Sequence, residues 1–142
     1  MIGPVTQLEL STHIDAAPAD VFSYFVDPAL YVRWQGTVAE LEPHPGGRFR
    51  VVVEAGQVAA GEYVAVEPPR RVVFTWGWEG NPLIPPGSST VEITLEAAGE
   101  GTLVRLRHTG LPDQAAVDMH SEGWNLYIGR LVAVAGRDPD RG

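Results

Sequence analysis

Three polar residues of this chain, Glu62, His108 and His120, lie in stretches that are otherwise apolar. A histidine gains or loses its proton near neutral pH, so a Glu–His pair could carry a proton to or from a substrate. The same three residues could instead be the few polar anchors that orient a ligand in an apolar pocket. Each histidine could also be structural, bonded to a backbone carbonyl or a helix end, and the sequence favours this role over catalysis.

The placement of Glu62 and His108 follows from strand alternation, in which every second side chain points to the same face. The rest of the predicted face of Glu62 consists of Val58, Ala60, Val64 and Val66, and that of His108 consists of Val104 and Leu106. Because an unpaired carboxylate against apolar surface costs several kcal/mol, Glu62 would need a donor, water or a proton. We expect Glu62 to point inward, and the alternative is a β-bulge at Gly61 that turns it outward.

Aromatic residues follow the same alternation in the predicted strand 71–79. The inward set consists of Val72, Phe74, Trp76 and Trp78, and the outward set holds Thr75, Gly77 and Glu79. Two further strands are expected to turn Phe49, Val51 and Val53, and Val91, Ile93 and Leu95, toward the same interior. The tryptophans are therefore predicted to form walls of the interior.

A helix is predicted from Pro112 to Ala135, and it carries most of the remaining candidate residues. One stripe at spacings of three or four residues consists of His120, Trp124, Tyr127 and Leu131. Gly123 lies beside this stripe, and we expect it to let the helix pack closely on the sheet. The helix is therefore predicted to cover the interior with an aromatic, histidine-bearing face.

The order of elements along the chain is predicted to be one strand, two short helices, six strands and the long helix. Pro18 opens the first short helix, and glycine- and proline-containing turns separate the later strands at hairpin spacing. The segment 80–87, GNPLIPPG, is a longer, semi-rigid loop at one end of the sheet. We expect an α+β fold and a single domain over residues 1–142, with a core at about 7–135 and a flexible tail at 136–142.

The composition excludes several classes of function. The net charge is −8, and the chain contains neither lysine nor cysteine. Schiff-base lysines, phosphate-loop lysines, thiolate nucleophiles and cysteine-ligated metals are therefore excluded. An acidic chain without a basic cluster is not expected to bind nucleic acid or anionic membranes.

No metal and no cofactor is expected, because the histidines lack a metal-binding spacing and no phosphate-binding loop is present. The chain shows neither a signal peptide nor a run of about 18 apolar residues, so a cytoplasmic protein without membrane insertion is expected. The bias toward Ala, Val, Gly and Arg indicates a GC-rich, bacterial genome.

Several blocks of the sequence resemble the SRPBCC (START/Bet v 1-like) superfamily, and within it the branch named after the heat-shock-protein-90 ATPase activator homologue. The most specific blocks are EPPRRVVFTW, HTGLP and HSEGW, and the resemblance extends from Gln7 to Ala135. It implies the helix-grip fold, in which a curved, seven-stranded antiparallel sheet grips the C-terminal helix around a cavity for hydrophobic ligands.

Three functions are compatible with these observations. The favoured one is binding of an uncharged or weakly cationic hydrophobic small molecule, since no arginine falls on a clear inward face. The expected ligand-binding residues are Trp34, Phe49, Glu62, Phe74, Trp76, Trp78, His108, His120, Trp124 and Tyr127.

The second function is a cofactor-independent enzyme of the cyclase, dehydratase or hydrolase type, with Glu62, His108 and His120 as candidate catalytic residues. Enzymatic activity is left open and is less favoured than binding. The third function, a co-chaperone-like interaction module, is disfavoured, because the activator that gives the branch its name joins a second domain to this one. A homodimer is compatible with the sequence.

Overall fold

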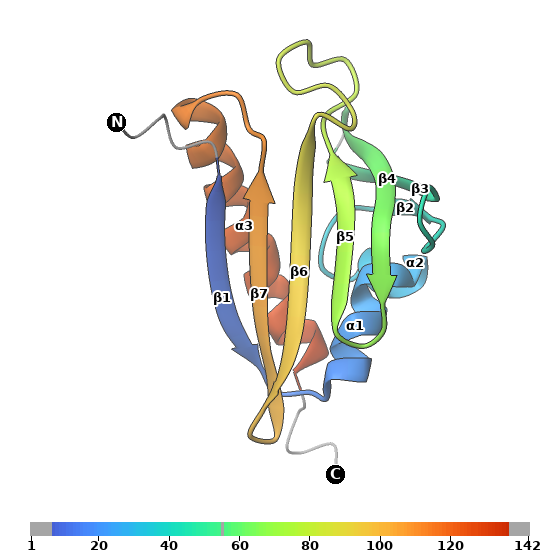
Figure 1. Cartoon of the computed structure of the whole chain (residues 1–142), viewed down its shortest axis with the longest axis vertical. Helices are drawn as coiled ribbons and strands as arrows, with labels where there is room; N and C mark the ends of the chain where they lie inside the picture. The colour runs from blue at the N-terminus through green and yellow to red at the C-terminus, as the bar shows by residue number, and fades with distance from the viewer. Residues whose placement is uncertain (1–6, 55, 137–142) are drawn as a thin grey trace.

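The computed structural model describes residues 7–54 and 56–136, and in these residues seven strands form one antiparallel sheet that bends around a long helix (Figure 1). The elements are β1 (Leu8–Ile14), α1 (Pro18–Val26), α2 (Pro28–Tyr31), β2 (Val38–Leu41), β3 (Arg48–Glu54), β4 (Gln57–Glu67), β5 (Arg71–Trp76), β6 (Ser89–Ala98), β7 (Gly101–Thr109) and α3 (Gln114–Ala135). The strand order is β1-β7-β6-β5-β4-β3-β2. The predicted order of elements and the helix-grip fold are confirmed. The tail predicted at 136–142 lies, apart from Gly136, outside the described residues.

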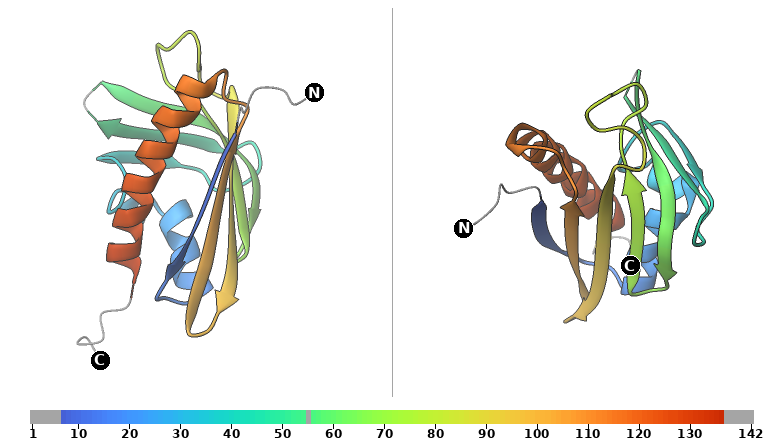
Figure 2. Two further views of the ribbon diagram at one scale, coloured as in Figure 1. Left: turned by 90° about the vertical axis from the view of Figure 1, so that its left-hand side faces the viewer. Right: turned by 45° about the horizontal axis from the view of Figure 1, so that its top comes forward.

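The sheet curves strongly, because β2 and β3 run across the direction of β1, β6 and β7, and β4 bends from the direction of β3 to that of β5 (Figure 2). Its concave side holds α3, and α1 and α2 lie on the same side behind β4 and β5 (Figure 1). Aspartates begin two of these helices. Asp27 Oδ1 accepts the Ala29 N–H at 2.9 Å, and Asp113 Oδ1 accepts the Ala116 N–H at 2.8 Å. These N-caps fix where α2 and α3 start.

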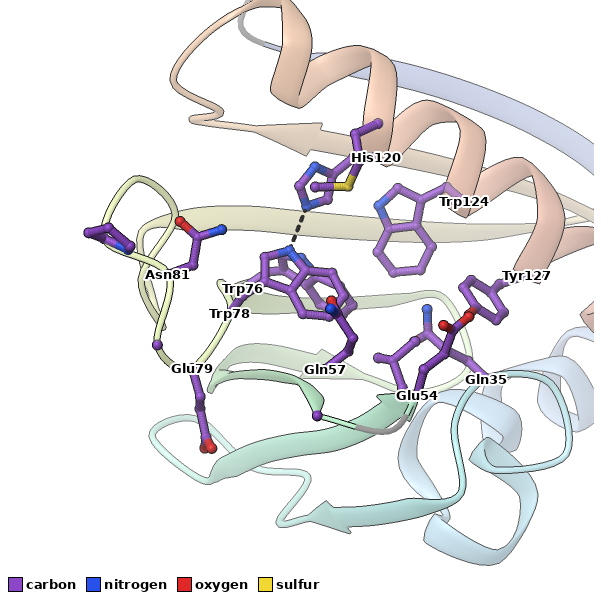
Figure 3. Close-up of a pocket in the computed structure, with 16 residues that line it drawn as sticks. Gln35, Glu54, Gln57, Trp76, Trp78, Glu79, Asn81, His120, Trp124 and Tyr127 are labelled. Carbon is purple, nitrogen blue, oxygen red and sulfur yellow. Dashed lines mark hydrogen bonds between the residues drawn. The ribbon is translucent and has the colours of Figure 1, made fainter.

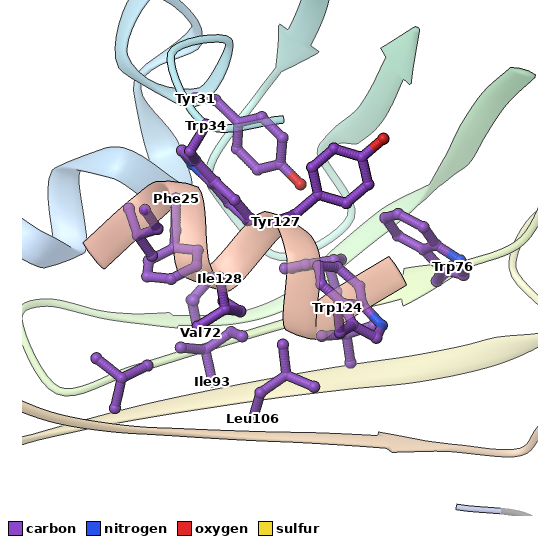
Figure 4. Close-up of a cluster of buried hydrophobic side chains, with 14 of the residues drawn as sticks. Phe25, Tyr31, Trp34, Val72, Trp76, Ile93, Leu106, Trp124, Tyr127 and Ile128 are labelled. Atoms are coloured by element: carbon purple, nitrogen blue, oxygen red, sulfur yellow. The ribbon is translucent and has the colours of Figure 1, made fainter. Parts of the chain in front are cut away.

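The core lies between α3 and the concave face of the sheet, and Figure 4 shows its aromatic part. Phe49 and Phe74 stack with ring centroids 4.1 Å apart. Trp124 of α3 packs on Trp76 at 5.0 Å and on Trp34 at 6.5 Å. Burial of each such side chain contributes about 1.5–3 kcal/mol to stability. Trp124 therefore anchors α3 to both the sheet and the segment after α2.

The face predicted for Glu62 is wrong, because β4 contains a β-bulge. Tyr63 pairs with Phe74 and Ala65 with Val73, so one extra residue lies between the two pairs on β4. A bulge of this kind shifts the alternation of side chains by one residue. Tyr63 is buried with 1% of its surface exposed, whereas Glu62 is exposed on the outer face.

The position of this bulge also explains the misleading pattern. Ahead of the bulge the inward residues are Ala59 and Tyr63, and beyond it Val66 packs partly against the core. Val64 is 50% exposed, although the uninterrupted alternation placed it inside. The predicted apolar face of β4 therefore joined residues from two different faces of the sheet. A bulge was foreseen as the alternative, but at Gly61.

The proline-rich loop 80–87 is held against the end of β5 by a close approach at Gly77. A Cβ atom at Gly77 would lie 1.8 Å from the carbonyl oxygen of Pro85. The Trp78 N–H donates to the Ile84 carbonyl at 2.7 Å, and Asn81 Oδ1 accepts the Ile84 N–H at 3.1 Å. The loop is thereby fixed in place beside Trp78.

Replacing Gly77 with alanine should therefore destabilise the protein by about 1–3 kcal/mol, since the loop backbone must move to admit a methyl group. Denaturant unfolding followed by tryptophan fluorescence measures this change. Gly80→Ala is the matched control in the same loop, because its Cβ would meet nothing within 4 Å and only its φ of +79° is unfavourable. Equal losses in the two variants would contradict the packing argument.

Candidate functional site

A cavity of about 540 Å³ opens between α3 and the end of β5 (Figure 3). One wall is formed by α3 through Met119, His120, Gly123, Trp124 and Tyr127. The wall opposite α3 is formed by Trp76, Trp78 and the loop residues Glu79–Pro82. The lining is completed by Val53 and Glu54 of β3, Gly56 and Gln57 at the start of β4, and Gln35 after α2.

The structure brings half of the predicted site residues to this cavity. Those in its lining are Trp76, Trp78, His120, Trp124 and Tyr127. Those buried in the core outside the lining are Trp34, Phe49, Phe74 and His108. Glu62 lies on the outer face of the sheet and reaches neither the cavity nor the core. Alternation identifies the inward side chains, but only the course of α3 decides which of them face empty space.

Several residues of the lining were not predicted from the sequence. Glu54 ends β3, and alternation there gives no sign that its side chain meets the helix. Gln35 is buried, and its Oε1 accepts the hydroxyl of Tyr31, so its NH₂ group is the donor left over for a ligand. The expectation that Gly123 packs on the sheet is wrong, because a Cβ atom there would meet nothing within 4 Å. Gly123 instead leaves space in the helix wall.

His108 lies in the middle of a buried chain of hydrogen bonds that leads from Trp124 to the Trp76 carbonyl. Its Nδ1 accepts the indole N–H of Trp124 at 3.0 Å, so its Nε2 carries the proton and donates to Ser89 Oγ at 2.8 Å. The Ser89 hydroxyl donates in turn to the Trp76 carbonyl at 2.8 Å. Burial, with a smaller effect of the neighbouring His120, lowers the pKa of His108 to about 3. His108 is therefore a neutral, structural histidine that orients Trp124.

His120 forms a similar pair at the edge of the cavity. Its Nδ1 donates to the Ala116 carbonyl at 2.8 Å, and its Nε2 accepts the indole N–H of Trp78 at 3.0 Å (Figure 3). Burial lowers the pKa of His120, and the hydrogen bond to Ala116 opposes this. Both ring nitrogens are engaged, so no lone pair is free to accept a proton from a substrate. His120 holds the Trp78 ring as part of the cavity wall.

Trp76 differs from the other three tryptophans, all of which donate their indole N–H to a partner. Its Nε1 is buried and has no hydrogen-bond partner among the described residues. An unused buried donor of this kind costs about 1–3 kcal/mol. The Trp78 ring packs against Trp76 edge to face with centroids 5.3 Å apart.

Two carboxylates give the cavity its charge. Glu79 is paired with Arg50, whose Nε and Nη2 donate to the two carboxylate oxygens at 2.8 and 3.1 Å. These hydrogen bonds from Arg50 lower the pKa of Glu79. Glu54 instead accepts the hydroxyl of Tyr127 at 3.2 Å. Burial, followed by the contact with Glu54, raises the pKa of Tyr127, so Tyr127 stays a donor at neutral pH.

Within residues 7–54 and 56–136, no three His, Asp or Glu side chains are grouped so that they could hold a metal ion. The helices described there include none that is long and apolar enough to cross a membrane.

The curved sheet, the C-terminal helix and the cavity between them define a helix-grip protein of the SRPBCC type. Residues 15–136 match the family described as activator of Hsp90 ATPase homolog 1-like protein, and the chain belongs to this family. The comparison with curated proteins finds no match.

Solved structures agree with this assignment. An AHSA1-like protein from Rhizobium etli is 44% identical, with a TM-score of 0.73 over 96% of this chain and 88% of its own. The protein MLL2253 from Mesorhizobium loti is 24% identical, with a TM-score of 0.80 over 89% and 94% of the two chains. The Aha1 dimer from Colwellia psychrerythraea is 13% identical, with a TM-score of 0.77 over 89% and 93%. The last two similarities show the fold alone.

Proposed function

We propose that this protein binds a small hydrophobic molecule in the cavity between α3 and the end of β5. The observation that carries the proposal is an aromatic-walled cavity of about 540 Å³, which lies in the size range of about 300–1,000 Å³ typical of ligand sites. Trp76, Trp78, Trp124 and Tyr127 supply apolar surface, and both nearby histidines are held neutral. A few polar groups at the edge would orient the ligand.

Native mass spectrometry of the protein as purified, followed by denaturing extraction, tests this proposal. We expect either a stoichiometric hydrophobic passenger or, for an empty protein, saturable binding of the neutral probe N-phenylnaphthylamine with quenching of tryptophan fluorescence. An empty protein that binds no probe across a panel of lipids, polyketides and aromatic compounds would contradict the proposal.

A cofactor-independent enzyme in the same cavity receives less support. Its three candidate catalytic residues do not converge, because Glu62 is on the outer face and His108 lies outside the lining. The hydrogen bonds of His120 occupy both of its ring nitrogens.

The support for a co-chaperone-like role consists only of membership of the activator family. Stimulation of the ATPase of a purified Hsp90 would support this role, and its absence would leave ligand binding as the proposed function. A homodimer and a cytoplasmic location also remain proposals, for which light scattering and cell fractionation are the tests.

A further inference from the structure

The charged side chains that line the cavity are all negative. Among the described residues of the lining, the charged ones are Glu54 and Glu79, and neither an arginine nor a lysine accompanies them. Glu79 belongs to a balanced ion-pair network, in which Arg50 donates to both Glu79 and Glu40, and Arg48 also donates to Glu40. Glu54 is therefore the carboxylate whose charge is left for a ligand.

The carboxylate of Glu54 has no positively charged partner among the described residues. Its partner is the neutral hydroxyl of Tyr127, and within the described part of the chain no arginine forms an ion pair with it. Arg130 of α3 instead lies against Tyr127, with its Cζ over the ring and 5.2 Å from the ring centroid. Figure 3 shows Glu54 and Tyr127 side by side at one end of the cavity.

The aromatic walls favour the same sign of ligand charge. Among aromatic rings, the face of Trp attracts cations most strongly, and Trp76, Trp78 and Trp124 border the cavity. His108 and His120 are neutral, so they add no positive charge that would repel a cation or attract an anion. A ligand carboxylate or sulfonate would meet Glu54 with no positive partner.

We infer that the cavity selects hydrophobic amines: the apolar body lies against the tryptophans and a protonated amine meets Glu54. This inference rests on the proposed function and adds the chemical class of the ligand. It also assigns a specificity-determining role to Glu54, which acts by charge and by its fixed place beside Tyr127. Neutral molecules of the same shape would bind more weakly, and the corresponding anions would bind weakest.

Three naphthyl compounds of nearly equal size test this order: naphthylmethylamine, naphthylmethanol and naphthoate, each titrated at pH 7 and low ionic strength by calorimetry. We expect the amine to bind about tenfold more tightly than the alcohol, and the carboxylate more weakly than both. In the Glu54→Gln variant the amine should lose more affinity than the alcohol, so that the advantage of the amine falls below about threefold.

Glu62→Gln is the matched control, because it removes the same charge from the exposed outer face of the sheet. The amine should keep its full advantage in this variant. Equal affinities of amine and alcohol in the unaltered protein, or equal losses in the two variants, would overturn the role of Glu54 and leave the cavity intact as a binding site. If none of the three compounds binds, this inference fails, and the native mass spectrometry and probe panel described above decide the proposed function separately.

Discussion

Replacing Gly123 with phenylalanine is expected to lower the affinity for naphthylmethanol by at least about 100-fold, or about 3 kcal/mol. Gly123 lies in the middle of the helix wall, and a Cβ atom there points into open space. A phenyl ring at this position would therefore occupy the volume that the ligand needs, without displacing a core side chain. Calorimetric titration measures the loss, and circular dichroism checks that the variant is folded.

Gly129 provides the matched control on the same helix. It is exposed, its Cβ would also meet nothing within 4 Å, and it lies outside the cavity lining. Gly129→Phe should leave the affinity unchanged. Gly123→Ala should keep binding and raise the free energy of unfolding by about 1 kcal/mol, because alanine favours a helix more than glycine does. A folded Gly123→Phe variant that binds normally would place the ligand elsewhere.

The sequence predicts the inward-facing side chains correctly in strands that contain no β-bulge. In β6 the alternating residues Val91, Ile93 and Leu95 are the buried ones, because this strand keeps its register with both neighbours. In β4 the same rule failed at Glu62, since the bulge between Tyr63 and Ala65 is set by the pairing with β5. Local pattern therefore gives the fold and most of the core, but it does not locate an inserted residue.

The site was harder to predict because its contacts join distant parts of the chain. Trp78 and His120 are 42 residues apart, and Tyr127 and Glu54 are 73 residues apart. The sequence of neither element alone indicates that the indole N–H of Trp78 donates to the imidazole of His120. The sequence could nominate His108 and His120 as candidates, whereas the chain of hydrogen bonds around His108 defines its structural role.

The buried state of His108 predicts that the protein loses stability in acid through this residue. Folding lowers its pKa from 6.5 to about 3, chiefly because burial disfavours the charged imidazolium. Between these two pH values the unfolded chain binds a proton that the folded chain does not, so the free energy of unfolding falls as the pH falls. His108 alone should remove about 2 kcal/mol by about pH 5 and about 4 kcal/mol by about pH 3. His120, whose pKa is also lowered, adds to this loss.

The His108→Gln variant separates this effect from the titration of the carboxylates. It should be less stable than the unaltered protein at about pH 7.5, by about 1–3 kcal/mol, because Trp124 or Ser89 loses an ideal partner. Its free energy of unfolding should nevertheless fall less steeply below about pH 6.5, so the two curves converge in acid. Urea unfolding at a series of pH values measures both slopes, and the exposed His44, replaced in the same way, controls for loss of any histidine. A His108→Gln slope as steep as that of the unaltered protein would mean that this imidazole takes up its proton without unfolding, and that the hydrogen bond from Trp124 does not hold it neutral.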